Sequence, residues 1–191
     1  AETIQGGAGF IVPDESYIKA LRQRCDETGA LLILDEIQPG FGRTGKWFAF
    51  QHYGITHDIV VMGKGMGGGM PVGAFTASSN LMDLLAEHPK LGHITTFGGH
   101  PVIAAACLAT LRELKSTTLI ADTLLKEQRI RENLRHPLIE EIRGKGLMLA
   151  LMFKDAETAN QLVLKAQEKG LILFWLLFEK RDVRITPPLA I

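Results

Sequence analysis

Two apolar runs in the first part of the chain each end in an unexpected polar residue. Residues 30–34 are followed by Asp35, and residues 59–63 are followed by Lys64. Short apolar runs that are rich in β-branched residues predict strands buried on both faces, as in parallel sheets. Ligands of such sheets bind beyond the carboxyl ends of the strands. We therefore expect the acid and the lysine to lie at a binding site.

Further patterns of apolar and polar positions predict the remaining elements. A stripe of apolar residues predicts a helix over residues 14–28, which Gly29 ends. Asp155 is a good N-cap for another helix. Helices are also expected at 101–114, 119–134 and 156–169, and strands at 74–78, 142–153 (a broken pair), 171–178 and 183–185. The helix over 101–114 is so rich in alanine that we expect it to be buried.

The character of the sequence changes near residue 115, where charged amphipathic helices and short strands begin. We predict that residues 1–114 are the C-terminal part of a larger α/β domain and that residues 115–191 form a smaller, truncated α+β domain. The chain begins at Ala1 inside a strand-like segment and ends on an apolar tail. It therefore reads as a fragment of a longer polypeptide, in which a targeting segment cannot be judged.

Composition narrows the classes of function. Hydrophobic residues make up 46% of the chain and glycine is frequent, which fits a cytosolic α/β protein. Basic and acidic residues number 21 each, so nothing builds the basic surface that nucleic acids or anionic membranes require. No apolar stretch reaches transmembrane length. Cys25 and Cys107 lack the spacing of metal ligands, and no metal site is expected.

The glycine-rich segment 40–46 formally matches two phosphate-binding motifs, but neither fits in detail. A P-loop requires Ser or Thr after the lysine, and Trp47 follows Lys46. The dinucleotide motif requires its first glycine directly after the strand, and residues 35–39 intervene. Both nucleotide-binding interpretations are therefore disfavoured.

Asp35 and Lys64 can each be explained without a function, as a turn cap and a solvated lysine. Their joint placement beside the glycine run 65–69 favours a site instead, because glycine lets the backbone approach a ligand closely. A lysine beside apolar walls loses solvation, and its neutral amine can attack a carbonyl. Pyridoxal phosphate catalysis uses both groups, with a lysine that forms an imine and an acid that partners the pyridinium nitrogen.

The sequence resembles a known family over essentially its whole length. The motifs that carry the resemblance are LLILDEIQPGFGRTGKWFAF, DIVVMGKGMGGGMPVGAF, HITTFGGHP, IRGKGLMLAL and VRITPPLAI. They are similar to motifs of the class III (ω-) aminotransferases, above all to the acetylornithine and ornithine aminotransferase branch. The resemblance implies fold type I, with a mostly parallel-sheet large domain that binds pyridoxal 5'-phosphate and a small α+β C-terminal domain.

The resemblance also implies roles for residues around the predicted strand ends. The lysine that bonds to the cofactor falls on Lys64, and the acid at the pyridine nitrogen falls on Asp35. The glutamine that contacts the ring hydroxyl falls on Gln38. Ile37 takes the position of the branched residue that packs under the ring.

Other matching positions lie further along the chain. Thr96 matches a threonine that reaches the phosphate of the partner subunit's cofactor, which implies a homodimer with a shared active site. Arg184 matches the arginine that binds the substrate carboxylate. Gly7 replaces a glutamate that shields this arginine in the ornithine branch, which favours a substrate with a blocked α-amino group. His100 replaces the usual asparagine of the family's G-G-N-P motif, with no consequence that we can derive.

Together these residues predict an aminotransferase of small molecules. The amino group would move from the ω-amine of an ornithine-like, N-acylated substrate to 2-oxoglutarate, a reaction of arginine biosynthesis in this branch. Alternatives are a 4-aminobutyrate or other class III ω-aminotransferase, an aminomutase or a decarboxylase. A catalytically incomplete fragment is a further alternative, because the family's phosphate loop and ring-stacking aromatic residue are not in this sequence.

Overall fold

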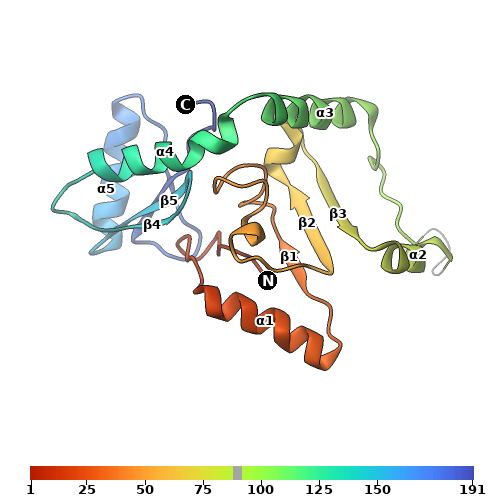
Figure 1. Cartoon of the computed structure of the whole chain (residues 1–191). Helices are drawn as coiled ribbons and strands as arrows, with labels where there is room; N and C mark the ends of the chain where they lie inside the picture. The colour runs from red at the N-terminus through yellow and green to blue at the C-terminus, as the bar shows by residue number, and fades with distance from the viewer. Residues whose placement is uncertain (88–91) are drawn as a thin grey trace.

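The computed structural model describes residues 1–87 and 92–191, which contain two sheets with helices around them (Figure 1). The helices are α1 (Glu15–Thr28), α2 (Ser79–Glu87), α3 (Pro101–Ser116), α4 (Leu119–Asn133) and α5 (Ala156–Glu168), with 3-10 turns η1 (Ala49–His52) and η2 (Lys64–Gly67). The strands are β1 (Ile33–Asp35), β2 (Ile59–Gly63), β3 (Gly73–Ala77), β4 (Ile139–Lys145), β5 (Met148–Phe153), β6 (Phe174–Trp175) and β7 (Asp182–Ile185).

The first sheet has the strand order β1-β2-β3. Strands β1 and β2 are parallel, and Asp35 lies opposite Val61. Their carboxyl ends therefore meet at one edge of the sheet, as predicted. The third strand, expected from the sequence at 74–78, runs antiparallel to β2. The fold class is confirmed as α/β, with a mixed first sheet.

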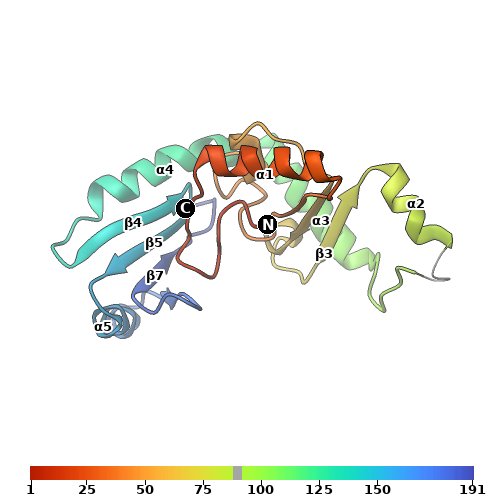
Figure 2. The same cartoon turned by 90° about the horizontal axis from the view of Figure 1, so that it is seen from below.

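The second sheet has the order β4-β5-β7-β6 and is antiparallel throughout. One face packs on α5 through a core of Leu151, Phe153, Ala159, Val163 and Val183. Figure 2 shows the two sheets toward opposite ends of the molecule, with α5 beside the second. The strand expected at 171–178 is reduced to β6, because β6 is an edge strand and pairs only with the short β7.

The predicted helix signals at α1 and α5 are confirmed. The Asp14 carboxylate accepts a hydrogen bond from the backbone N–H of Ser16 at 2.8 Å, and Gly29 ends α1 with a φ of 72°. The Asp155 carboxylate accepts from the N–H of Thr158 at 2.8 Å. These caps satisfy backbone donors that have no partner inside the helix.

Two expectations about burial were wrong. In the run over 30–34, Leu34 is buried, but Leu31 and Ile33 are 51% and 45% exposed, so only one face is covered. Helix α3 is also largely exposed, since Leu114 is its only buried residue and Val102 is 57% exposed. Apolar composition shows that a face favours burial, but it does not specify which neighbour covers it.

The N-terminal segment crosses to the second sheet. Ile4 and Phe10 are fully buried in a cluster with Met148, Ala150 and Leu176 on the face of the sheet that is opposite α5. Residues far apart in the sequence thus share one core, and the division at residues 114 and 115 stays a prediction. Within the described residues, no helix has the length and apolar character needed to cross a membrane.

Candidate functional site

Lys64 directly follows β2 and lines a cavity of about 790 Å³. This volume is within the range of small-molecule sites. The backbone of Lys64 has a φ of 42°, which is uncommon for a residue with a side chain and is often found at functional sites. No hydrogen bond or ion pair joins its amine to another residue in the described part of the chain. The amine is therefore available to a ligand.

Asp35 ends β1, next to the strand that delivers Lys64. Its Oδ1 accepts a hydrogen bond from the backbone N–H of Ile37 at 2.9 Å. Ile37 lines the same cavity as Lys64. Gln38 follows and packs on Gly6 so closely that a Cβ at Gly6 would lie 2.2 Å from the amide nitrogen of Gln38. Asp35 and Gln38 are close to Ile37 in the sequence, but neither residue lines the cavity.

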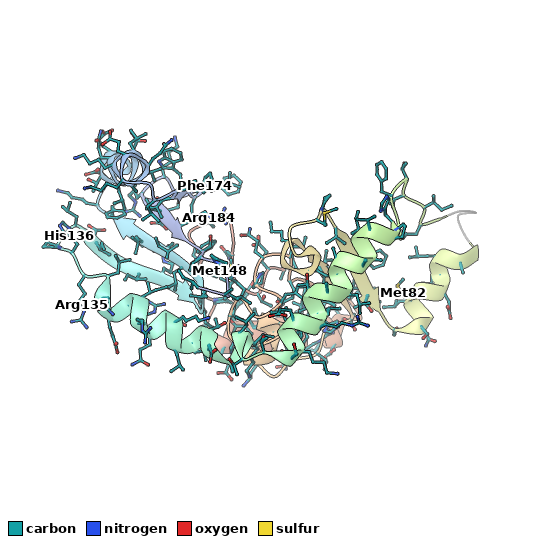
Figure 3. All side chains as sticks on the ribbon, turned by 90° about the horizontal axis from the view of Figure 1, so that it is seen from above. Met82, Arg135, His136, Met148, Phe174 and Arg184 are labelled. Carbon is teal, nitrogen blue, oxygen red and sulfur yellow. The ribbon has the colours of Figure 1, made fainter. Side chains whose placement is uncertain are left out.

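The remaining predicted site residues, Thr96 and Arg184, do not line this cavity either. Thr96 is exposed, although its neighbours Thr95, Gly98 and Gly99 line the cavity. Arg184 lies on β7 of the second sheet, near the labelled Phe174 and Met148 (Figure 3). Its Nε is buried and has no hydrogen-bond partner among the described residues. An unpartnered buried donor is unusual in proteins and is suited to an anionic ligand.

Glu36 was not predicted from the sequence as a residue of the site, yet this acid next to Asp35 is fully buried. Its carboxylate accepts hydrogen bonds from Thr3 Oγ1 at 2.9 Å and from the N–H groups of Ala49 and Phe50 at 2.8 and 2.9 Å. Burial raises the pKa of Glu36, although these hydrogen bonds partly lower it. The one signal in the sequence is the position of Glu36 between a strand and the apolar Ile37.

The glycine-rich segment 40–46 follows β1 in the sequence and makes hydrogen bonds to the region of the second sheet. The Arg43 guanidinium donates to the carbonyl oxygens of Leu147 at 3.2 Å and Pro187 at 2.5 Å. Lys46 donates to the carbonyl oxygen of Gln51 at 3.0 Å. Burial, followed by the nearby charge of Arg184, lowers the pKa of Arg43. The basic residues of this segment therefore have structural partners.

The residues at the first sheet fit one end of pyridoxal phosphate. Lys64 offers a free amine at the cavity, and Asp35 offers a carboxylate whose Oδ2 makes no hydrogen bond in the described part of the chain. Ile37 supplies an apolar part of the wall of the cavity that Lys64 also lines. An amine, an acid and an apolar surface are the protein groups that this cofactor uses.

Comparison with known proteins identifies the family. The family model described as Aminotransferase class-III matches residues 1–191. Relatives include a putrescine aminotransferase of Pectobacterium atrosepticum (43% identical), a leucine/methionine racemase of Thermococcus litoralis (40%) and an acetylornithine aminotransferase of Caldanaerobacter subterraneus (40%). Each match covers 100% of this chain and, in that order, 42%, 45% and 48% of the relative. The chain thus spans about half the length of the curated relatives that it matches.

A solved structure agrees with these matches. The ornithine aminotransferase from Toxoplasma gondii ME49 has a TM-score of 0.90 and 34% sequence identity, covering 100% of this chain and 46% of that one. Both the predicted family and the predicted fold are therefore confirmed. The chain belongs to the class III aminotransferases, a family that depends on pyridoxal phosphate.

Proposed function

We propose that the full-length protein is an aminotransferase that moves the ω-amino group of an ornithine-like, N-acylated donor to 2-oxoglutarate. The observation that carries this proposal is the free Lys64 amine in its cavity, at the end of the strand beside Asp35. When bound, pyridoxal phosphate supplies an electron-accepting ring that stabilises negative charge on the substrate carbon.

The residues at the first sheet would share the work at the ring. Lys64 Nζ would hold the cofactor covalently, and its free amine would carry a proton to and from the substrate carbon. The Asp35 carboxylate would hold the proton on the ring nitrogen. Gln38 would donate to the ring hydroxyl, and Ile37 would pack beneath the ring.

Thr96 supports a homodimer with a shared site. It lies in a segment where the large apolar side chains of Ile94 and Phe97 are 69% and 73% exposed. Neighbouring exposed apolar side chains of this size are typical of interaction surfaces. In the proposed dimer, the Thr96 hydroxyl would reach the phosphate of the partner subunit's cofactor, and no membrane or nucleic acid would take part.

Two residues of the chain bear on the identity of the donor. Arg184 favours a donor with a carboxylate, and Gly7 provides no acid that could occupy that arginine in place of the substrate. The likeness to a putrescine aminotransferase favours a diamine instead, and the likeness to a racemase favours inversion without amino transfer. With an N-acylated ornithine as the donor, we propose a cytoplasmic enzyme of arginine biosynthesis.

A donor panel tests the proposal. Full-length protein with pyridoxal phosphate and 2-oxoglutarate is incubated with N-acetylornithine, ornithine, putrescine or 4-aminobutyrate, and glutamate is measured. We expect the highest kcat/KM with N-acetylornithine. A higher kcat/KM with putrescine or 4-aminobutyrate would replace the donor. A parallel incubation with L-leucine that forms D-leucine, with no glutamate from any donor, would refute amino transfer.

A further inference from the structure

The guanidinium of Arg184 lies against an aromatic ring rather than an acid. Its Cζ is 5.8 Å from the centroid of the Phe10 ring, within the range of cation–π interactions. Among the described residues, no ion pair includes Arg184. The nearby Arg43 is also cationic, and its donors point to backbone carbonyl oxygens. Within the described part of the chain, the guanidinium of Arg184 therefore has the Phe10 ring as its partner.

Phe10 is firmly held in this position. Its side chain is fully buried in the cluster on the second sheet, which includes Ala150, the residue opposite Arg184 in the ladder of β5 and β7. Its backbone has a φ of 51°, and Gly9 before it has a φ of 103°. A left-handed φ at a bulky residue is costly and persists only where the surroundings determine it.

An ion pair holds the turn before Phe10. Arg143 Nη1 lies 3.7 Å from Asp182 Oδ2 and donates to the carbonyl oxygen of Gly9 at 3.4 Å. A Cβ at Gly9 would lie 2.7 Å from that Asp182 oxygen and 2.8 Å from Arg143 Nη1. The turn therefore fits closely against β4 and β7. Asp182 precedes Arg184 by two positions on the same strand, so the turn and the arginine share one support.

The chemistry of a guanidinium explains what this arrangement does. Its flat face can stack on a ring while the N–H groups at its edge bind a carboxylate through two parallel hydrogen bonds. The ring thus occupies a surface that the carboxylate does not need. The buried Nε of Arg184, which has no partner among the described residues, is one of the edge donors that would remain free.

We propose that Phe10 is a positioning residue, whose ring orients the Arg184 guanidinium so that its edge receives a substrate carboxylate. The proposal rests on the role of Arg184 given under Proposed function. It deepens that role, because it makes recognition of the carboxylate depend on an aromatic face delivered by the N-terminal segment.

The test measures binding of glutarate, a dicarboxylate without an amine, as a competitive inhibitor of the full-length enzyme with its cofactor bound. In F10L the site keeps apolar volume but loses the aromatic face. We expect its inhibition constant for glutarate to rise about threefold to thirtyfold, with kcat changed by less than about twofold. F10M serves the same purpose if F10L does not fold.

Two further variants make the result specific. I4V removes a methyl group from the same core cluster, so it controls for loosened packing, and we expect glutarate to bind it as in wild type. R184Q is expected to lose glutarate inhibition, and F10L/R184Q should lose no more.

The outcomes separate the two ideas. Unchanged glutarate binding in F10L, or an equal loss in I4V, would overturn the role of Phe10 while leaving Arg184 in place. Wild-type glutarate binding in R184Q would instead refute the carboxylate-binding role of Arg184 on which the proposal rests.

Discussion

At the scale of single residues, the acid beside Asp35 has a structural role. Glu36 has no solvent exposure and collects hydrogen bonds from the N-terminal segment and from η1. It therefore joins three parts of the chain directly beneath the edge of the first sheet. A buried carboxylate with several donors is costly to remove, because the donors lose their acceptor.

We predict that E36Q lowers the free energy of unfolding by about 2–4 kcal/mol, since its amide places an N–H group against backbone donors. Urea denaturation of both proteins gives this difference. E15Q is the matched control, because Glu15 is exposed and, in the described part of the chain, forms an ion pair with Lys19 alone, and its change should stay below about 0.5 kcal/mol. Equal effects of the two substitutions would contradict the structural role of Glu36.

Asp182 makes stability depend on pH. Burial raises the pKa of its carboxyl from 3.8 to about 6, with Glu179 and Glu141 raising it further and Arg143 and Arg181 lowering it. Between these values the folded protein binds more protons than the unfolded chain. The contribution of Asp182 is therefore fully present below pH 3.8 and is lost as the pH rises to about 6.

We predict that D182N, which cannot titrate, flattens this decline. The measurement is the urea midpoint of D182N and wild type at a series of pH values across this window. The difference between the two midpoints should change between pH 3.8 and about 6 and be constant above that range. A difference that does not vary with pH would mean that Asp182 keeps an ordinary pKa.

At the scale of elements, Gly146 allows the hairpin between β4 and β5 to pack closely on its neighbour. Gly146 has a φ of 63°, and a Cβ there would lie 2.4 Å from the carbonyl oxygen of Arg43 and 2.6 Å from Cα of Thr44. The next N–H, of Leu147, donates to the same Arg43 oxygen at 2.9 Å. The hairpin thus docks on the glycine-rich segment 40–46.

We predict that G146A lowers the free energy of unfolding by more than the cost of placing alanine at a left-handed φ. Gly170 has a φ of 80° with open space around it, so G170A isolates the backbone cost of about 1–2 kcal/mol. G146A should cost about 1–3 kcal/mol more because of overpacking. Thermal unfolding of both variants gives the comparison, and equal costs would contradict the close docking of the hairpin.

The sequence predicts these elements unevenly. The helix over 14–28, its cap and its final glycine could be predicted because the signals are local. The direction of β3 could not, because a strand pattern is the same for parallel and antiparallel neighbours. The exposure of α3 could not either, because covering a face depends on the rest of the fold.

At the scale of the whole molecule, the proposed site would draw on both sheets, with Lys64 at the first and Arg184 on the second. Asp35 and Lys64 could be predicted together, since the ends of parallel strands meet at one edge. Arg184 needed the family resemblance, because a single charge on a short strand has no distinctive pattern. Phe10 could not be predicted at all, since its contact with Arg184 joins opposite ends of the chain.

The proposed dimer gives a prediction at this scale. Phe97 is 73% exposed beside Thr96, so F97D would place a charge in the interface and weaken dimerisation at least about tenfold. Sedimentation of the full-length protein measures the change. Y17D is the control. Tyr17 on α1 is also exposed (59%), but it is far from Thr96 in the sequence. A dimer unaffected by F97D would place the interface elsewhere.

Chemical trapping would show directly whether Lys64 carries the cofactor. Full-length protein is incubated with pyridoxal phosphate, reduced with borohydride, digested and analysed by mass spectrometry. We predict that the added pyridoxyl mass lies on the peptide that contains Lys64, and that K64A loses both this label and turnover. A label on another lysine such as Lys46, or full turnover by K64A, would contradict the account.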